Sequence, residues 1–434
     1  MFLRRSITVV AAATALCAAT APAASAAPWI SAGSISASSK SAPAKGGKTP
    51  EALYGKADPK YDGVWRQSMA LLALDAAGAD PARKAVDWLV RQQCDDGSFT
   101  AYRADPGAAC DEKKTPGDTN ATGLAVQALS AVGGEGAAVR KALAWLRTVQ
   151  NKDGGWGYNP GGPSDANSVS VVVGAYAAAG KSPEKIAKSG KSPYDALTSL
   201  QLGCDAQAAS RGAFAYQPGN GGKLAANDDA TAAAVLAASG SGLLVERRPN
   251  RPLAPLSCGK GDGGEGKPRT RDEAGDAGAA YLASVLAKNG NHLRAVTPGA
   301  KGTPDYANTA DAVVALAAGG HRAQAEKSLN WLAAKLGSWD KAERDPAAIS
   351  GVMLAVHATG GDAAKLKGTD LLGRLVATGP EPARMPDEKS ATGGVTDEDG
   401  DGGAVLRWSL LGAGLAAGAG IGFLISARRK RRGL

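Results

Sequence analysis

The sequence predicts an all-α fold in which six inner helices are surrounded by six outer helices in a closed double ring. Two observations predict it. A short Gly-rich phrase with an aromatic residue recurs along the chain, and such internal repetition is typical of architectures built from repeated helix pairs. Between the phrases, segments of two kinds alternate, one apolar on every side and the other with a single apolar face.

The recurring phrase ends one helical segment and precedes the next. Its clearest copies are Gln92–Phe99, which reads QQCDDGSF, and Gln150–Tyr158, which reads QNKDGGWGY. A degenerate copy lies at Arg211–Tyr216 and a worn copy at Gly337–Trp339. Each copy predicts a loop that joins an outer helix to the inner helix that follows it.

The inner helices are expected where Ala-rich segments are apolar on all sides, because such a helix belongs inside a structure. Each segment begins with Asp or Asn, which are good N-caps, and ends at Gly, which is a good C-terminal stop. All are too short and too interrupted to cross a membrane. The six segments are Asp62–Gly78, Asp118–Gly133, Asp165–Gly180, Asn227–Gly240, Asp305–Gly320 and Asp345–Gly360.

The outer helices are expected where apolar residues recur at helical spacing on one face, with Arg, Lys and Glu opposite. Inner and outer segments alternate strictly, which an inner ring of parallel helices inside an outer ring would satisfy. An open stack of helix pairs is the competing geometry, and the lack of obvious polar end caps favours closure. The outer segments are Asp80–Gln93, Gly136–Gln150, Pro193–Gln201, Asp272–Gly290, His321–Gly337 and Gly361–Thr378.

The two ends of the chain indicate export and anchoring. Residues 1–26 have a positive start, an apolar stretch and a small-residue cleavage site, as a secretory signal does. An uncharged run, Trp408–Ala427, lies within a membrane helix predicted over 404–427, and the basic residues of 428–434 follow it. Because positive charge stays on the cytoplasmic side, we expect a single-pass membrane protein with its folded domain outside the cell.

Flexible segments are expected on either side of the folded domain, which we predict over 58–378. Residues 27–57 are rich in Ser, Ala and Lys and predict a disordered linker. Residues 379–403 are acidic and rich in Pro and Gly, which predicts a stalk. The net charge of +9 comes mostly from the two ends: without their seven basic residues, 43 basic residues face 41 acidic ones. A near-neutral domain gives no reason to expect nucleic-acid binding.

Four cysteines remain once the signal segment, which contains Cys17, is removed. An even number outside the cell predicts two disulfides, and four cysteines allow three pairings. We favour Cys94–Cys110 and Cys204–Cys258, because each would close one loop between neighbouring helices.

The Gln-x-x-Asp-Gly-Gly-Trp phrase at Gln150–Trp156 resembles the repeat of squalene cyclases and of protein prenyltransferase β subunits. Those families share a closed α6/α6 toroid. The larger domain of the vertebrate cobalamin carriers is similar, and the complement thioester domains are further relatives. The resemblance covers roughly Tyr61 to Thr378, and it implies the toroid more specifically than it implies any reaction.

The cyclase reaction is the first activity that the resemblance implies. Class II terpene cyclases protonate an alkene with an Asp-x-Asp-Asp-Thr-Ala motif. The nearest match reads ANDDAT, so Asp228 and Asp229 are the candidate acids, while Ala226 and Ala230 depart from the motif. Cyclase pockets are also lined with aromatic faces that stabilise cations, whereas the predicted ectodomain has only two Phe, Phe99 and Phe214. These departures favour a protein without catalysis, and we leave the question of an enzyme open.

The other relatives imply chemistry that the residues do not match. Prenyltransferases use a zinc site with an Asp-x-Cys pair and a His, but no cysteine here has Asp two positions before it. His292, His321 and His357 lack metal-ligand spacing, so neither a metal nor another cofactor is expected. Cys204 and Gln207 have the spacing of an internal thioester, but a disulfide accounts for Cys204 more simply.

All the phrases should emerge at one rim of the ring, beside the N-termini of the inner helices. A concave site with apolar walls and a few oriented polar groups is the default ligand pocket. Each residue has an alternative role in capping helices and fixing loops. The predicted ligand-binding residues at this rim are Trp65, Asp118, Asn120, Thr122, Trp156, Tyr158, Asp165, Asn167, Tyr216, Asp228, Asp229, Asp305 and Asn308.

Three functions are compatible with such a rim. The first is non-catalytic capture of a bulky small molecule at the cell surface, with a corrinoid as the most concrete candidate and a membrane transporter as a conceivable partner. The second is an enzyme acting on isoprenoid or lipid substrates through Asp228 or Asp229. The third is an interaction scaffold without a small ligand, which a mouth filled by side chains would favour and an open cavity would not.

Overall fold

The computed structural model describes residues 50–111, 113–259, 270–297 and 299–386. The predicted signal segment, the predicted membrane helix and the basic tail lie outside these residues. Within them, no helix combines the length and apolarity needed to cross a membrane. The described residues belong to one compact unit that ends at Pro386.

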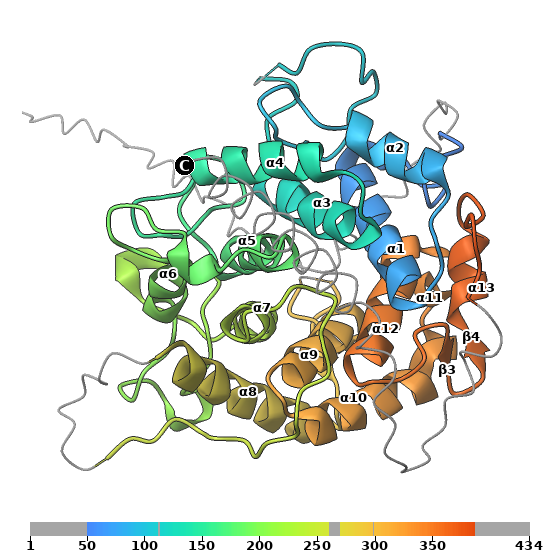
Figure 1. The fold of residues 1–434 in the computed structure, drawn as a ribbon. Helices are drawn as coiled ribbons and strands as arrows, with labels where there is room; N and C mark the ends of the chain where they lie inside the picture. The colour runs from blue at the N-terminus through green and yellow to red at the C-terminus, as the bar shows by residue number, and fades with distance from the viewer. Residues whose placement is uncertain (1–49, 112, 260–269, 298, 387–434) are drawn as a thin grey trace, which may run out of the picture. The chain divides into compact units, whose positions relative to one another are not determined.

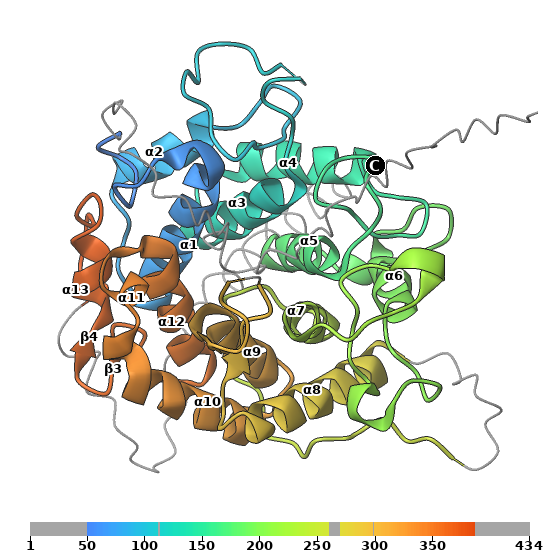
Figure 2. The same cartoon turned by 180° about the vertical axis from the view of Figure 1, so that it is seen from behind.

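Six inner helices form a closed ring (Figures 1 and 2). Each contacts the next in chain order, and the last contacts the first, so the closed geometry is correct and the open stack is not. The inner helices are α1 (Gly63–Ala76), α3 (Thr119–Val132), α5 (Ala166–Ala178), α7 (Asp228–Ala238), α9 (Tyr306–Ala318) and α12 (Pro346–Ala358).

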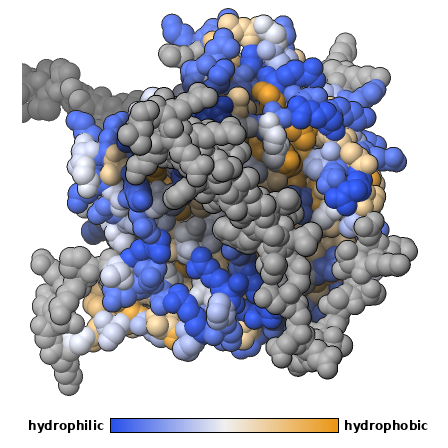
Figure 3. Space-filling view, viewed as in Figure 1, coloured by the Kyte–Doolittle hydropathy of each residue, from blue (hydrophilic) through white to orange (hydrophobic). Residues whose placement is uncertain are grey.

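An outer helix packs against each inner helix. Apolar residues of both rings form one large core. The surface that can be seen in Figure 3 is mainly hydrophilic, with apolar residues in separate patches. The outer helices are α2 (Arg83–Arg91), α4 (Gly136–Thr148), α6 (Pro193–Ser199), α8 (Arg271–Lys288), α10 (Arg322–Lys335) and α13 (Leu371–Val376).

Short elements complete the unit and modify the predicted all-α pattern. Strands β1 (Leu293–Arg294) and β2 (Pro304–Asp305) pair antiparallel between α8 and α9. Strands β3 (Lys365–Leu366) and β4 (Thr369–Asp370) pair antiparallel inside the predicted outer helix Gly361–Thr378, which is therefore helical only over α13. The remaining elements are the short helix α11 (Lys341–Arg344) and the 3₁₀ turns Pro59–Tyr61, Pro183–Lys185, Ala208–Ser210, Asn220–Gly222 and Leu336–Ser338.

The ends of the inner helices follow the predicted pattern closely. Five of the six are capped by the side chain of the predicted residue, which accepts a hydrogen bond from a backbone N–H of the first turn. The exception is Asp62, which forms an ion pair with Arg66 instead. The glycine at the end of each inner segment has a positive φ, between 67° and 85°, which terminates the helix.

The folded unit extends beyond its predicted boundaries. Tyr54, in the predicted linker, is fully buried, and its hydroxyl donates a hydrogen bond to the carbonyl of Pro380 at 2.7 Å. Arg384, in the predicted stalk, forms an ion pair with Asp80. We therefore correct the limits of the domain to include residues 50–57 and 379–386, which join the two ends of the ring.

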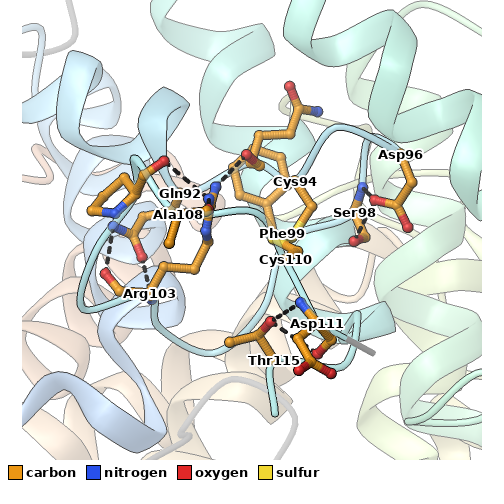
Figure 4. The surroundings of a disulfide bond; sticks show 12 residues. Gln92, Cys94, Asp96, Ser98, Phe99, Arg103, Ala108, Cys110, Asp111 and Thr115 are labelled. Carbon is orange, nitrogen blue, oxygen red and sulfur yellow. Dashed lines mark hydrogen bonds between the residues drawn. A yellow bond between two sulfur atoms is a disulfide. The ribbon is translucent and has the colours of Figure 1, made fainter. Parts of the chain in front are cut away.

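Both favoured disulfides are present, and the thioester alternative for Cys204 is excluded because that residue is bonded to Cys258. The Cys94–Cys110 bridge ties back the long loop after the first phrase (Figure 4). Arg103 is buried inside this loop, and its guanidinium donates to four backbone carbonyls, including that of Ala108. The guanidinium of Arg103 thus holds the loop together, because backbone carbonyls of the loop and of the phrase accept its hydrogen bonds.

Each full phrase links two neighbouring outer helices. The side-chain amide nitrogen of Gln150 donates to the carbonyl of Gly154 within its own phrase and to that of Ile186, which follows the 3₁₀ turn Pro183–Lys185 in the segment that leads to α6. Gln93 makes the same pair of bonds in its own phrase, and Gln201, which precedes the degenerate copy, donates to the carbonyl of Gly212 in that copy and to that of Ala274 on α8. The worn copy at Gly337–Trp339 has no such glutamine. In three repeats, the glutamine at the phrase therefore stabilises the contact between one repeat and the next.

Candidate functional site

The N-terminal rim of the inner ring is built by hydrogen bonds between the phrases and the inner helices. The N–H of each cap residue donates to the carbonyl of the aromatic residue in the preceding phrase: Asp118 to Phe99, Asp165 to Trp156 and Asn227 to Phe214, at 2.8 to 3.0 Å. The N–H groups of Thr119 and Ala166 in turn donate to the carbonyls of Tyr158 and Tyr216 in the following phrase. Consecutive repeats are thus interlocked along the rim.

In three repeats, a threonine four residues after the cap makes further hydrogen bonds between the inner helix and the segment that precedes it. The hydroxyl of Thr122 donates to the carbonyl of Asp118 at 2.7 Å and accepts the N–H of Phe99 at 2.8 Å. Thr231 and Thr309 make the equivalent bonds in their own repeats. Thr122, which the sequence analysis placed in a ligand site, is fully buried and makes these hydrogen bonds.

Several other predicted site residues are also used by the fold. Trp156 is fully buried, and its indole N–H donates to the carbonyl of Leu146, so it faces the core rather than the rim. Trp65 is buried in the core as well. Asp118 is bonded to the Tyr158 hydroxyl, and burial raises the pKa of its carboxyl. Asp165 is fully buried, and both of its oxygens accept hydrogen bonds from Ser168.

A smaller group of predicted residues does come together around a cavity. A cavity of about 420 Å³, which we call the rim cavity, opens beside the N-termini of α7, α9 and α12. Asp228, Asp229, Asp305 and Asn308 line it. The sequence analysis did not include the other main lining residues, which are Asn227, Arg294, Tyr306, Trp339, Lys341 and Asp345. The remaining predicted residues do not line this cavity.

The carboxyl groups of the rim cavity are held by short polar contacts. The hydroxyl of Tyr281, on α8, donates to Asp228 at 2.7 Å. Burial raises the pKa of Asp228, the nearby charge of Asp305 raises it further, and the Tyr281 hydrogen bond lowers it. Asp305 accepts two hydrogen bonds from Asn308, and burial raises its pKa too. These two carboxyls therefore keep their protons to higher pH than an exposed Asp does.

Asp229 belongs to a row of polar side chains that runs from the rim cavity along the inner ring. Asn120, Asn167 and Asp229 occupy the same position in three consecutive helices, two residues after the cap. The amide nitrogen of Asn167 donates to Asp229 at 2.9 Å. This contact connects two residues that are 62 positions apart in the sequence, and it fixes Asp229 at the wall of the cavity.

Aromatic rings form one wall of the rim cavity. The ring of Tyr306 is stacked on that of Trp339, with centroids 5.2 Å apart and planes 10° apart. On its other side Tyr306 contacts Trp331, which is itself stacked on His292 at 4.4 Å. Trp339 belongs to the worn phrase, so a copy that has lost its glutamine supplies an aromatic face to the cavity.

The opposite end of the ring is covered by the segment 241–259. Leu243 and Val245 are buried there, and the N–H of Leu243 donates to Gln127 of α3. Further along, Arg251 donates to the carbonyl of Gly319, and the segment ends at the disulfide of Cys258. The rim cavity therefore lies at the end of the ring that this segment leaves uncovered.

No group of three or more His, Cys, Asp or Glu side chains among the described residues is placed to hold a metal ion. The rim cavity offers carboxyl groups, hydroxyl groups and aromatic faces. Such a set can bind a small molecule and can accept or donate a proton.

Comparisons with known proteins found similarities of both sequence and structure. Residues 51–157 match the family model of the squalene-hopene cyclase C-terminal domain. Over 122 residues the chain is 34% identical to drimenyl diphosphate synthase of Streptomyces showdoensis, a match that covers 25% of this chain and 21% of that protein. A crystal structure of a protein from Actinoplanes shares 14% identity with a TM-score of 0.44, covering 72% of this chain and 95% of the other.

The closed ring and these partial matches support a likeness to the terpenoid cyclase and prenyltransferase-like toroid superfamily. The likeness to the squalene-hopene cyclase C-terminal domain extends over residues 51–157. The chain spans about a fifth of the length of the Streptomyces relative.

Proposed function

We propose that the protein is a terpenoid cyclase-like toroid that binds an isoprenoid in the rim cavity and acts on it through a carboxyl group. The observation that carries this proposal is the meeting of two carboxyls of raised pKa, Asp228 and Asp305, with the stacked rings of Tyr306 and Trp339 in one cavity. Protonation of an alkene needs a carboxylic acid, and the cation that forms needs an aromatic face.

Asp228 is the candidate acid in this proposal. Tyr281 fixes its position by a hydrogen bond to one carboxyl oxygen, and burial favours its protonated form. The linear cyclase motif is incomplete at Ala226 and Ala230. Asp305, which caps the neighbouring inner helix α9, supplies a second carboxyl close enough to affect the pKa of Asp228. A pair assembled from two helices can thus stand in for a pair within one motif.

This proposal takes the place of capture without catalysis as our leading interpretation. The family match and the relative's name point to terpenoid chemistry, whereas none of these findings supports binding of a corrinoid. An open cavity of about 420 Å³ at the rim also favours a small ligand over a scaffold, since ligand sites generally have volumes of about 300 to 1,000 Å³.

The test is turnover by the purified full-length protein. We would incubate it with squalene, farnesol and farnesyl diphosphate and identify the products by mass spectrometry. We expect a cyclised or hydrated product from at least one substrate and a loss of about 100-fold or more in Asp228→Asn, as removal of a general acid causes. Asp87→Asn, on the outer surface of α2, removes a similar carboxyl and should leave turnover unchanged.

Two results would count against the proposal in different ways. Turnover that survives in both Asp228→Asn and Asp305→Asn would remove the carboxyl mechanism. If the wild-type protein neither binds nor converts any of the three compounds, isoprenoid chemistry at the rim cavity is wrong.

A further inference from the structure

Basic side chains gather on one stretch of the outer wall, away from the rim cavity. Residues 136–200 contain eight basic and four acidic residues, and one of the four, Asp165, is fully buried. In the chain between its two charged ends, by contrast, 43 basic residues face 41 acidic ones. Charge of one sign is thus concentrated on a domain that is nearly neutral as a whole. We call six of the exposed basic side chains the basic band: Arg140, Lys141, Arg147, Lys152, Lys185 and Lys191.

The basic band consists of two strips that meet at the C-terminal end of α4. The first strip is α4 itself, which packs on the outside of α3 (Figure 1). The second is the segment 185–191, which leads to α6. The ammonium group of Lys188 joins the strips, because it donates to the carbonyls of Thr148, at 3.1 Å, and of Gln150. Beside this junction, a Cβ atom at Gly154 would lie only 2.7 Å from the carbonyl oxygen of Lys191.

The first strip has charge of one sign only. α4 has 13 residues, among which three are basic and none is acidic. The outer helices α2, α8 and α10 each contain at least one acidic residue among their basic ones. Exposed helix faces gain from such mixing, because opposite charges three or four residues apart attract. The like charges of α4 repel one another instead, and a bound anion would relieve this repulsion.

The acidic side chains nearest to the basic band in the sequence have other partners. Glu184 forms an ion pair with Arg271. Asp153 accepts a hydrogen bond from the Ser164 hydroxyl at 2.8 Å, and Asp195 closes the capping box of α6. Within the described part of the chain, no carboxyl group forms a salt bridge with a member of the band. The band therefore presents its positive charge to the solvent.

The composition of the basic band indicates a chain-like partner rather than a membrane. A helix that lies on a membrane carries large apolar side chains opposite its basic ones, and these enter the lipid. In the described residues the exposed large apolar side chains are Tyr61, Tyr158, Val296 and Met385, and none belongs to α4 or to the segment 185–191. A strip of exposed cations without apolar anchors suits the repeated charges of a linear polyanion.

We propose that the basic band binds a linear polymer with a phosphate group in every repeat, at the cell surface to which the predicted export would bring the domain. The polymer follows α4 from Arg140 to Arg147 and then crosses the junction between Lys152 and Lys191. Each contact between a basic side chain and a phosphate releases bound counter-ions, so the affinity falls steeply with salt. Binding at the band is independent of any chemistry in the rim cavity.

The experiment is calorimetric titration of the full-length protein with poly(glycerol phosphate) at about 50 mM and about 200 mM salt. The test variant carries Lys141→Gln, Arg147→Gln and Lys185→Gln, and it keeps Lys188, which holds the two strips together. The matched control carries Lys288→Gln, Lys327→Gln and Lys335→Gln, which remove three exposed charges from α8 and α10. A third variant, with Lys141→Arg, Arg147→Lys and Lys185→Arg, keeps the charge of the band.

Two further measurements accompany the titration. Thermal unfolding followed by circular dichroism should give the same midpoint for all three variants as for the wild type, because exposed substitutions seldom change stability. Flotation with vesicles of phosphatidylglycerol, compared with vesicles of phosphatidylcholine, offers the same phosphoglycerol group on a membrane. The difference between the two lipids reports binding to the charged head group alone.

We expect the test variant to bind the polymer at least about ten-fold more weakly than the wild type at the lower salt concentration. The control and the charge-preserving variant should bind as the wild type does. The proposal is overturned if the wild type does not bind at millimolar phosphate repeats, if the test variant binds unchanged, or if the test and control variants weaken equally. It is also overturned if the test variant loses its preference for phosphatidylglycerol vesicles but keeps its affinity for the polymer, since the partner would then be a membrane.

Discussion

Gly154 is the position where the phrase and the next outer helix approach most closely, and replacing it tests the phrase as a structural device. A Cβ atom at Gly154 would lie 2.2 Å from the carbonyl oxygen of Ser192 and 2.7 Å from that of Lys191. Both neighbours are backbone atoms, so one of the two segments would have to move. The residue also has φ +90°, which costs an L-amino acid free energy independently of the contact.

The expected magnitude is the sum of these two costs. The left-handed backbone costs about 1 to 2 kcal/mol, and forcing an extra methyl group into a tightly packed place costs about 1 to 3 kcal/mol. Gly154→Ala should therefore lower the free energy of unfolding by about 2 to 5 kcal/mol. Movement of the loop would also weaken the bond from Gln150 to the carbonyl of Gly154.

Gly161 provides the matched control. Its φ is +78°, and a Cβ there would have no atom within 4 Å. Gly161→Ala should therefore cost only the backbone part, about 1 to 2 kcal/mol. The assay is urea unfolding followed by far-UV circular dichroism, with the midpoints compared at a common slope. If the two variants lose the same stability, the close approach has no energetic weight and our account of the phrase is wrong.

Three further predictions concern other contacts. Gln201→Ala leaves two carbonyls without their donor and should cost about 2 to 4 kcal/mol in urea unfolding, whereas Gln217→Ala, on the surface, should cost less than about 1 kcal/mol. Burial raises the pKa of Asp165 from 3.8 to about 6, so the folded state binds this proton more tightly than the unfolded chain. The Asp165 contribution to stability should be greatest below pH 4 and fall by about 3 kcal/mol as pH rises through 6, a slope that Asp165→Asn should remove in unfolding measured across this range. Replacing Cys204 and Cys258 by Ser should lower thermal stability more than the same change at the other bridge, because the bonded residues are 54 rather than 16 positions apart, and adding a reductant should abolish the difference.

The ring and its helix ends could be predicted because their causes are local in the sequence. An Asp such as Asp165 caps the helix that begins one residue later, and a Gly such as Gly180 ends it. The turn at Lys367 and Gly368 also has a local signal. Both residues have positive φ, which a glycine favours, and they form the hairpin that interrupts the predicted helix Gly361–Thr378.

The site could be predicted only in part, because its walls come from distant segments. Asp228 could be found from its resemblance to a motif, but its partner Tyr281 lies 53 residues away on another helix. Lys341 belongs to a helix of only four residues that has no periodicity to detect. Trp156 was predicted at the rim because it belongs to a phrase that emerges there, yet loop residues have no periodicity that shows which side chains face the core.

The hydrogen bonds that join residues 50–57 to residues 378–386 determine how a force on the C-terminal end of the described unit reaches the ring. The chain enters and leaves the circle at one point, where Gly55 donates to the carbonyl of Thr378 and Tyr54 to that of Pro380. A force applied at residue 386 would therefore load these two hydrogen bonds in sequence. The packing of α1 against α12, which closes the ring, would resist the same force.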